Sequence, residues 1–300
     1  NEAKNAMAGL QHPDMVLRPD DFVMIKANWE PKSQNLLDVA HTLSLTPDSF
    51  VFVDDNPAER EIIRQQIKNA TVPEVGDKPE DFIRCLDQMG YFEVTSISAD
   101  DANREKMYHE NAERAKLEEN FSDYREYLLS LEMKAQIGAF IPIYYSRIAQ
   151  LSNKTNQFNL TTRRYTQTEI EAIAKDASYI TLYGKLFDKF GDNGVVSVVI
   201  GHQSRETMDI ELWIMSCRVL KRDMECAMMD ETVEVCRRRR IKKIIGHYYP
   251  TAKNSMVRDF FGSQGFVKVD EDESGNSKWE LEVDEYKARN HVIELCEVSL

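Results

Sequence analysis

Two adjacent acids, Asp54 and Asp55, directly follow the apolar run Phe50–Val53. Such a run is typical of a buried strand, and open α/β sheets bind their ligands at the carboxyl ends of their strands. Two carboxylates there repel each other unless a cation lies between them, and hard oxygen ligands beside phosphate favour Mg²⁺. Lys32 immediately precedes a predicted helix, where its ammonium group could hold a phosphoryl oxygen. The pattern indicates a phosphate-handling Mg²⁺ site, and the alternative is that the two acids only turn a strand into a helix.

A thiol in the second half of the chain is the other candidate reactive group. Cys217 ends a predicted strand, Asp209–Cys217, and is followed by Arg218. A thiol near a cation and a helix start can have a depressed pKa and act as a nucleophile or relay. His247, near the end of the next predicted strand, is a candidate base for it. The alternatives are a small buried core cysteine and a structural histidine.

The elements that must position the first site alternate between helix and strand. Ser33–Leu43 carries apolar residues on one helical face, Phe50–Val53 is the predicted strand, and a second helix should begin at Pro57. This βα order is that of a parallel sheet. From Ser98, which with Asp101 resembles a capped helix start, to about residue 134 the sequence is densely charged and predicts one or two connecting helices.

The elements that must position the second site follow Gly138. Helices are predicted at Ile141–Leu151, Thr168–Lys175, Met224–Arg238 and Ser255–Gly262, and strands at Tyr179–Phe187, Val195–Gly201, Asp209–Cys217, Lys243–Tyr248, Phe266–Val269 and Lys278–Val283. This order predicts an α+β domain with a mainly antiparallel sheet.

Two blocks of the first half, Asn28–Asn35 and Phe50–Glu61, resemble the haloacid-dehalogenase (HAD) superfamily in its FkbH-like branch. The resemblance implies that Lys32 binds phosphate and that Asp54 and Asp55 hold Mg²⁺. The earlier motifs of that family, an Asp-x-Asp nucleophile pair and a Ser/Thr-bearing strand, have no match in residues 1–27. We therefore expect an N-terminally truncated fragment that lacks the aspartyl nucleophile and is inactive in phosphoryl transfer.

Four blocks of the second half, Gln150–Tyr165, Phe190–Gly194, Met215–Leu220 and Tyr249–Asn254, resemble the C-terminal domain of FkbH proteins, which is similar to the GNAT acyltransferase fold. The expected fold class is α/β: a partial HAD-like parallel domain (residues 1–92), a helical linker (93–136) and a GNAT-like α+β domain with a mixed, mainly antiparallel sheet (137–300).

The resemblance also implies a reaction. The parent enzyme would dephosphorylate a small phosphorylated three-carbon acyl donor and pass the glyceryl group, through a thioester, to the phosphopantetheine arm of an acyl carrier protein in polyketide biosynthesis. Polar residues inside the blocks are the expected substrate-binding groups: Asn159, Thr161, Arg163, Arg218, Lys253 and Asn254.

One alternative is a GNAT enzyme that uses acyl-CoA, and another is a non-catalytic module that binds a carrier. Acyl-CoA enzymes of that fold bind the diphosphate at a helix N-terminus, with the pattern Arg or Gln, two residues, Gly, any residue, Gly or Ala. Here Lys221 and Asp223 stand where small residues belong, and Asp223 would repel a diphosphate. Lys221 and Arg222 could instead meet the single phosphate of a phosphopantetheine arm.

The basic run Arg237, Arg238, Arg239 and Arg240 stands out in a chain of net charge −13. It could complement the negative end of a helix, or it could dock an acidic carrier protein. The overall charge argues against non-specific nucleic-acid binding. There is no apolar stretch of about 18 residues and no export-signal pattern, so we expect a cytoplasmic protein without a membrane span. The five cysteines lack ligand spacing and indicate neither zinc nor disulfides.

Overall fold

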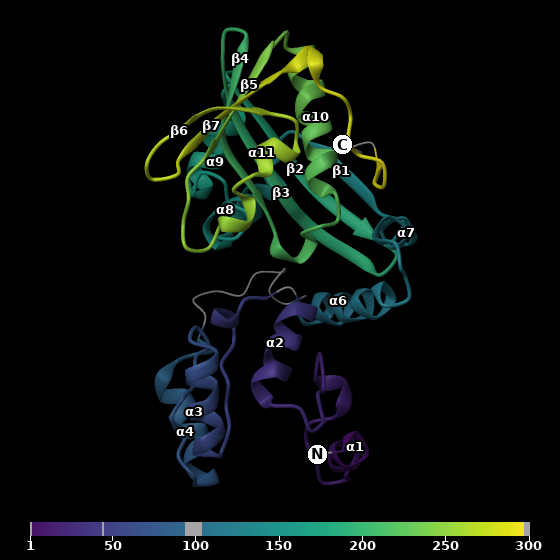
Figure 1. The fold of residues 1–300 in the computed structure, drawn as a ribbon, viewed down its shortest axis with the longest axis vertical. Coiled ribbons are helices and arrows are strands. Elements are labelled where there is room, and N and C mark those ends of the chain that lie inside the picture. The colour runs from purple at the N-terminus through teal and green to yellow at the C-terminus, as the bar shows by residue number, and fades with distance from the viewer. Residues whose placement is uncertain (1, 44, 94–103, 297–300) are drawn as a thin grey trace. The chain divides into compact units, whose positions relative to one another are not determined.

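The computed structural model describes residues 2–43, 45–93 and 104–296, which form two compact units, residues 1–120 and 121–300 (Figure 1). We call them the N-terminal and C-terminal units. The division between them lies inside the range 93–136 predicted as a linker. Ser98 and Asp101 lie outside the described residues. In the described part of the chain, no helix has the length and apolarity needed to cross a membrane.

The N-terminal unit consists mainly of helices: α1 (Ala3–Leu10), η1 (Pro19–Asp21), α2 (Lys32–Thr42), η2 (Pro47–Ser49), α3 (Pro57–Gln66), α4 (Pro79–Met89) and α6 (Arg104–Glu118). The predicted helix at Ser33–Leu43 is confirmed as α2. Pro57 begins α3 as predicted, and the Asn56 side chain caps that helix by accepting from the backbone N–H of Ala58.

The predicted buried strand Phe50–Val53 is only partly formed. Val51 makes a single parallel bridge with Thr71, supported by backbone hydrogen bonds from Phe52 N to Thr71 O (2.8 Å) and from Thr71 N to Phe50 O (3.1 Å). The run is half-buried rather than buried, and Val53 is 42% exposed. The reason is that, within the described residues, this segment pairs with a neighbour on one edge, so its other edge forms no inter-strand hydrogen bonds.

The C-terminal unit contains a mixed sheet in the order β6-β7-β5-β4-β3-β2-β1-β8. Its helices are α7 (Tyr124–Ser130), η3 (Pro142–Tyr144), α8 (Tyr145–Lys154), α9 (Gln167–Lys175), η4 (Cys217–Val219), α10 (Met224–Arg238), η5 (Ser255–Val257), α11 (Phe260–Ser263) and η6 (Val283–Glu285); its strands are β1 (Lys134–Gly138), β2 (Tyr179–Asp188), β3 (Gly191–Ser204), β4 (Thr207–Met215), β5 (Lys243–Tyr248), β6 (Val267–Glu271), β7 (Ser277–Glu282) and β8 (Glu294–Leu295). The β4–β5 and β1–β8 pairs are parallel and the remaining pairs are antiparallel, which confirms the predicted mixed, mainly antiparallel sheet.

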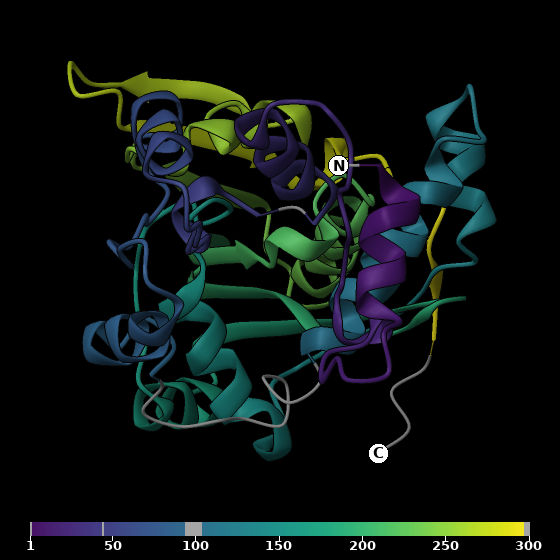
Figure 2. The ribbon, with the colours of Figure 1, turned by 90° about the horizontal axis from the view of Figure 1, so that it is seen from below.

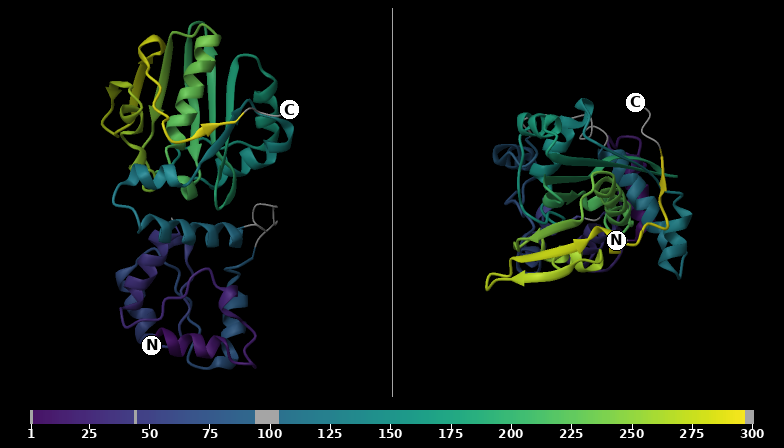
Figure 3. Two further views of the ribbon diagram at one scale, coloured as in Figure 1. Left: turned by 90° about the vertical axis from the view of Figure 1, so that its right-hand side faces the viewer. Right: turned by 90° about the horizontal axis from the view of Figure 1, so that it is seen from above.

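Helices cover both faces of this sheet (Figures 2 and 3). On one face, α8 packs with β3 and β4, and α9 packs with α8 and β2, in a core that includes Ile148, Ile170, Ile200 and Leu212. On the other face, α10 contacts β1, β2 and β3. Gly184 allows this close approach, because a Cβ atom there would lie 2.3 Å from a methyl carbon of Met224. The central strands are therefore buried on both sides.

Some elements differ from the predictions in their bounds, and two short strands were not predicted. The predicted helix Ile141–Leu151 begins as η3, with Pro142 at its first position, and continues as α8. The predicted helix Ser255–Gly262 is divided into η5 and α11. The short strands β1 and β8 were not predicted, because five and two residues give too little periodicity to recognise.

Candidate functional site

Lys32 and Asp54, two residues assigned to one site from the sequence, meet in the N-terminal unit. Lys32 is the first residue of α2, and Asp54 follows the bridged segment at Val51. The Lys32 Nζ atom lies 2.6 Å from Asp54 Oδ2, and the Asp54 side chain is 8% exposed against 47% for Lys32. Asp54 Oδ1 also accepts the backbone N–H of Asn56 at 2.9 Å. The carboxylate is thus fixed, while the ammonium group remains accessible to solvent.

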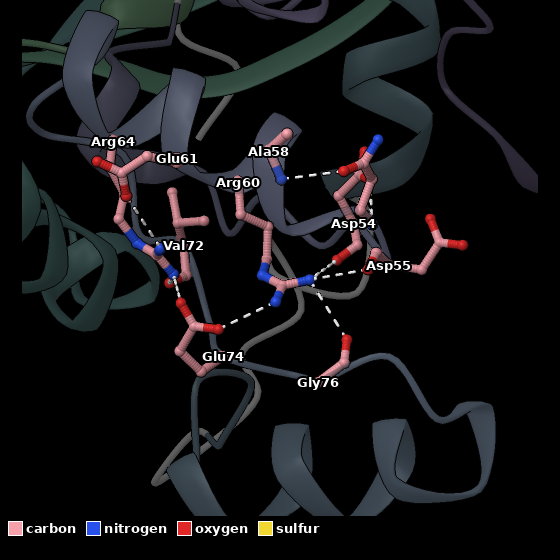
Figure 4. Close-up of polar contacts among 10 residues, drawn as sticks. Asp54, Asp55, Ala58, Arg60, Glu61, Arg64, Val72, Glu74 and Gly76 are labelled. Carbon is pink, nitrogen blue, oxygen red and sulfur yellow. Dashed lines mark hydrogen bonds and ion pairs between the residues drawn. The ribbon is translucent and has the colours of Figure 1, made fainter.

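A buried arginine, not recognised from the sequence, positions the loop that carries these acids (Figure 4). Arg60 is 4% exposed, and its Nη1 atom donates to the carbonyl oxygens of Asp54 (2.9 Å), Asp55 (3.0 Å) and Gly76 (3.3 Å). Its Nη2 atom lies 3.1 Å from Glu74 Oε2, and Arg64 also binds Glu74. Burial alone would raise the pKa of Glu74, but hydrogen bonds from Arg64 and Arg60 hold it below its ordinary value of 4.5.

The side chains of the loop that carries Asp54 and Asp55 provide only some of the ligands that a magnesium ion needs. Asp54 and Asp55 offer the hard oxygen atoms that Mg²⁺ takes, and Asp55 is exposed. The described residues hold no cluster of three or more Asp, Glu, His or Cys side chains placed to bind a metal. A Mg²⁺ ion at this loop would therefore take its remaining ligands from water and phosphate oxygens, which is its usual habit in phosphate-handling sites.

The C-terminal unit has a gap between two parallel strands. β4 and β5 pair only over Thr207–Asp209 and Lys243–Ile245, and beyond these residues they separate. The segment Phe158–Thr161, from the loop between α8 and α9, enters the gap and forms an antiparallel bridge between Asn159 and Ile214. Asn159 and Thr161, expected to bind substrate, both belong to this segment, which joins the two strands.

An open cleft of about 850 Å³ lies beside the paired ends of these strands. It is lined by Thr161, Arg163, His202, Ser204, Arg205, Glu206, Thr207, Asp209, Ile210, Glu211, Ile245, His247 and Tyr249. Within it, His247 Nε2 lies 3.2 Å from Asp209 Oδ2, and the His247 ring stacks on Tyr249 with 6.1 Å between centroids. A carboxylate accepts from the Nε2–H tautomer, so the pair leaves Nδ1 of His247 as the basic nitrogen.

A second polar group joins two cleft residues, Arg163 and Glu211, to Tyr165, which does not line the cleft. Arg163 Nη1 donates to Glu211 Oε2 at 2.5 Å, and the Tyr165 hydroxyl donates to the same oxygen at 3.3 Å. Thr161 Oγ1 donates to the Glu211 carbonyl at 2.6 Å. A hydrogen bond with Tyr165 raises the pKa of the Arg163 guanidinium, and burial raises the pKa of Tyr165. Arg163 is therefore a fixed positive charge, paired with Glu211, in a wall that carries both acidic and basic side chains.

The structure does not bring His247 and Cys217 together, although the sequence suggested that His247 could serve Cys217 as a base. His247 contacts Asp209 near the start of β4, whereas Cys217 opens η4 beyond the end of that strand. At about 3.3 Å per residue, these eight residues of largely extended chain span on the order of 25 Å. Cys217 is partly buried, and Arg218 follows it in η4.

Two of the other predicted binding residues have structural partners. Asn159 accepts the backbone N–H of Thr162 at 2.8 Å and is 1% exposed. Asn254 is fully buried and donates to the carbonyl oxygens of Asn159 and Tyr249, both at 2.9 Å. Lys253 is exposed on the loop after β5. A buried amide that holds two backbone carbonyls has no donor left for a ligand.

The turn before α10 also differs from expectation. Arg222, predicted as a phosphate ligand, is 7% exposed and pairs with Asp188, with 3.3 Å between Arg222 Nη1 and Asp188 Oδ2. That phosphate role is wrong, because the guanidinium points into the protein. Lys221 and Asp223 adopt left-handed backbone conformations with φ of 65° and 58°. Burial raises the pKa of Asp223, and it raises the pKa of Glu225, in the first turn of α10, to about 7.

The basic run at the end of α10 is mostly engaged within the unit. Arg237 donates to the carbonyl oxygens of Val283 and Tyr286, Arg238 binds Glu231 at 2.7 Å, and Arg239 donates to the Ala177 carbonyl. Arg237 and Arg238 lie in the last turn of α10, where a positive charge complements the helix dipole. These arginines therefore complement the negative end of α10. Docking of a carrier protein stays a prediction, and it depends on Arg238 and Arg240.

Sequence reasoning missed Asp209 and Glu211 as cleft residues, and it missed Tyr165 as a hydrogen-bond partner of Glu211. Asp209 and Glu211 are acids two residues apart in a strand that is otherwise apolar, and this alternation could have placed both on one open face. Tyr165 gave no comparable signal.

Comparison with known proteins finds partial likenesses only: no family model and no curated protein matches the chain. Among solved structures, the ribosomal-protein-S18-alanine N-acetyltransferase from Escherichia coli is 8% identical and has a TM-score of 0.39, with 50% of this chain and 94% of that chain covered. Ard1 from Thermoplasma volcanium is 19% identical with a TM-score of 0.38, covering 49% of this chain and 97% of that chain. The N-terminal part of a Bacteroides fragilis protein that contains a phosphatase domain, solved with Mg, is 38% identical with a TM-score of 0.31, over 32% of this chain and 26% of that chain.

Proposed function

We propose that the C-terminal unit catalyses acyl transfer in the cleft beside β4 and β5. The observation that carries this proposal is the His247–Asp209 pair, with 3.2 Å between its nitrogen and oxygen, inside an open cleft of about 850 Å³. A histidine oriented by a carboxylate is a typical general base near neutral pH. Asp209 fixes the tautomer, and Nδ1 of His247 receives the proton.

The reaction follows from this arrangement. The acceptor sulfur or nitrogen bonds to the acyl carbonyl carbon as the bond to the leaving group breaks, and the acceptor proton moves to Nδ1 of His247. The imidazolium, stabilised by Asp209, can then return the proton to the leaving group. The Arg163 guanidinium lines the same cleft and supplies a positive charge for an anionic substrate group.

The finer proposal concerns the substrate. We assign a glyceryl group as the acyl group, a small phosphorylated three-carbon compound as its donor, and the phosphopantetheine thiol of an acyl carrier protein as the acceptor. Two separate sequence blocks that carry the FkbH resemblance meet in the cleft, since Thr161 and Arg163 belong to one and Tyr249 to the other. That convergence supports the assignment because the blocks lie far apart in the sequence.

The N-terminal unit would supply the phosphate-handling part of the same enzyme. Asp54 and Asp55 would hold Mg²⁺, and the ion would neutralise phosphate charge when bound. Lys32 would bind a phosphoryl oxygen, and its half-exposed ammonium group, 2.6 Å from Asp54, supports this role.

Docking of the acidic carrier would use the exposed arginines at the end of α10. Arg238 is 62% exposed and Arg240 is exposed, whereas Arg237 and Arg239 are tied to backbone carbonyls. Replacing both Arg238 and Arg240 by glutamate should slow carrier loading at low salt and have little effect at high salt, because complementary charge acts mainly on the association rate. An unchanged loading rate at low salt would remove this part of the proposal.

The central test uses His247→Gln and Asp209→Asn in transfer assays with a phosphopantetheine-bearing carrier. We expect His247→Gln to lower the rate about 100-fold or more, and Asp209→Asn to shift the pH dependence of the rate. His41→Gln, at an exposed histidine of α2 outside the cleft, is the matched control and should leave the rate unchanged. Full activity of His247→Gln would contradict acyl transfer by this pair. Carrier binding without transfer in the wild type would favour a non-catalytic carrier-binding module.

A further inference from the structure

The turn between β3 and β4 presents polar side chains to the cleft. In the antiparallel register, Ser204 lies opposite Thr207, and two residues further along the strands His202 lies opposite Asp209. Because side chains alternate between the two faces of a strand, these four residues share one face, and all of them line the cleft. Arg205, which follows Ser204 in the turn, also lines it. The turn is therefore part of the cleft wall that carries the proposed catalytic pair.

Each of the three carboxylates that line the cleft has a basic neighbour. The pairs are Glu206 with Lys242, Asp209 with His247, and Glu211 with Arg163. Arg205 is exposed, and within the described residues its side chain forms no ion pair and donates no hydrogen bond. Its guanidinium is thus a permanent positive charge in the cleft that no described carboxylate compensates.

The backbone of the turn is held in place by its neighbours. Glu206 O accepts the backbone N–H groups of Lys242 at 2.8 Å and Lys243 at 3.2 Å, and Gln203 Nε2 donates to Arg205 O at 3.2 Å. Arg205 has a left-handed conformation with φ of 54°, which favours glycine over a residue with a long side chain. A charged residue kept at such a position is an outlier from which a functional role can be inferred.

A phosphate group matches the donors that the turn offers. A guanidinium binds two phosphate oxygens at once, and the hydroxyl groups of Ser204 and Thr207, which donate no hydrogen bond in the described part of the chain, can reach further oxygens. Thr207 and Asp209 are two residues apart in β4, a separation of roughly 7 Å. A compound of a few carbon atoms can span this distance, whereas a phosphopantetheine arm separates its phosphate from its thiol by a much longer chain.

We propose that the β3–β4 turn binds the phosphate group of the small acyl donor, with Arg205 as the residue that selects a phosphorylated donor. This inference rests on the proposed acyl transfer and names the residues that recognise its substrate. The site belongs to the C-terminal unit and is separate from the Lys32 site of the N-terminal unit. Its first test is a binding measurement, which does not require transfer to occur.

The first experiment is an NMR titration of the isotope-labelled whole chain with glycerol 3-phosphate, followed at the backbone amide signals of Arg205, Glu206 and Thr207. Signals around Lys32 report separately on the N-terminal unit. We expect saturable shifts at the turn with glycerol 3-phosphate and none with glycerol, which lacks the phosphate. Arg205→Gln should weaken this binding at least about tenfold, a change of about 1.4 kcal/mol. Equal affinity in the two proteins, or no shift at the turn in the wild type, would overturn the proposal.

Three variants control for other causes of lost binding. Arg205→Gly should bind as weakly as Arg205→Gln yet resist urea at least as well as the wild type, because glycine suits the φ of 54°. Arg258→Gln, at an exposed arginine that pairs with Glu271 outside the cleft, should bind like the wild type. Arg163→Gln should weaken binding less than Arg205→Gln does, because Arg163 is already paired. A larger loss in Arg163→Gln would place the phosphate at that residue and contradict the proposal.

Transfer assays distinguish the two sources of a phosphate group. Arg205→Gln should raise the KM for the phosphorylated donor about tenfold and leave the KM for the carrier unchanged, because the lost contact is to the donor alone. A raised KM for the carrier only would assign the turn to the phosphodiester of the carrier and refute the donor assignment. His247→Gln should still bind glycerol 3-phosphate at the turn, so failure of the proposed transfer and failure of this site can be told apart.

Discussion

Replacing Glu225 by glutamine should stabilise the C-terminal unit at neutral and alkaline pH. Burial is the main cause that raises the pKa of this carboxyl from 4.5 to about 7, and nearby Asp223 adds to it. The folded state thus holds the proton more tightly than the unfolded state does. The contribution of the Glu225 carboxyl to the free energy of unfolding is fully present below about pH 4.5 and is lost as the pH rises through about 7. The pKa difference corresponds to at most about 3 kcal/mol.

The assay is urea denaturation followed by tryptophan fluorescence. Trp213 and Trp279, both in the C-terminal unit, are 0% and 6% exposed, while Trp29 of the N-terminal unit is 82% exposed and should change little. The sequence pI is about 5.1, so low protein concentration and the range pH 5.5 to 8.5 are suitable. Between pH 5.5 and pH 8.5, the difference in free energy of unfolding between the wild type and Glu225→Gln should change by roughly 2 of the 3 kcal/mol.

The control is Glu169→Gln in the capping box of α9, where hydrogen bonds from Thr166 lower the carboxylate pKa. Here the sign reverses, because a lowered pKa stabilises the folded state above the unfolded pKa, so the glutamine variant should be less stable at neutral pH. The reasoning about Glu225 would be refuted if Glu225→Gln and the wild type had parallel stability curves across the pH range.

Three further predictions concern other residues. Arg60→Met should destabilise the N-terminal unit by about 3 kcal/mol, because it removes the buried guanidinium that donates to three partly buried carbonyl oxygens. Arg84→Met, at an exposed ion pair, should cost less than about 0.5 kcal/mol, and urea denaturation followed by circular dichroism compares the two variants. Gly246→Ala should cost about 2 kcal/mol in the tryptophan assay, because its Cβ would lie 2.4 Å from the Phe261 ring. Cys217→Ala should leave the rate of acyl transfer unchanged, because Cys217 opens η4 beyond the end of β4, far from the His247–Asp209 pair; a large loss of transfer in a carrier-loading assay would show that the thiol takes part.

Much of the C-terminal fold could be predicted from the sequence because its strands are long and rich in β-branched and aromatic residues. Val195–Gly201 and Lys243–Tyr248, for example, appear within β3 and as β5. The order of the strands follows less directly from local pattern. The segment Phe158–Thr161 pairs with β4 residues about 55 positions away in the sequence, and the loop has no apolar periodicity from which this pairing could be predicted.

The sequence indicates which residues belong to the candidate sites, but it identifies the contact partners of only some of them. Lys32 and Asp54 were assigned to one site and do meet. His247 was noticed as a base, yet its partner is Asp209, because parallel pairing of β4 with β5 sets their starts side by side. Arg222 looked like an anion ligand because its charge is visible in the sequence, while its burial against Asp188 depends on the hairpin between β2 and β3.

The short strand β8 has a consequence for how the protein behaves in solution. It pairs with β1 through Glu294 N to Met133 O at 3.0 Å and Cys296 N to Ala135 O at 2.8 Å, and Lys134 adds an ion pair with Glu294. At the opposite edge, β6 instead exposes charged side chains, which discourage pairing with another chain. Cutting the chain before Glu294 would uncover the β1 edge as a template for a second copy, so such a truncation should aggregate where the intact chain does not.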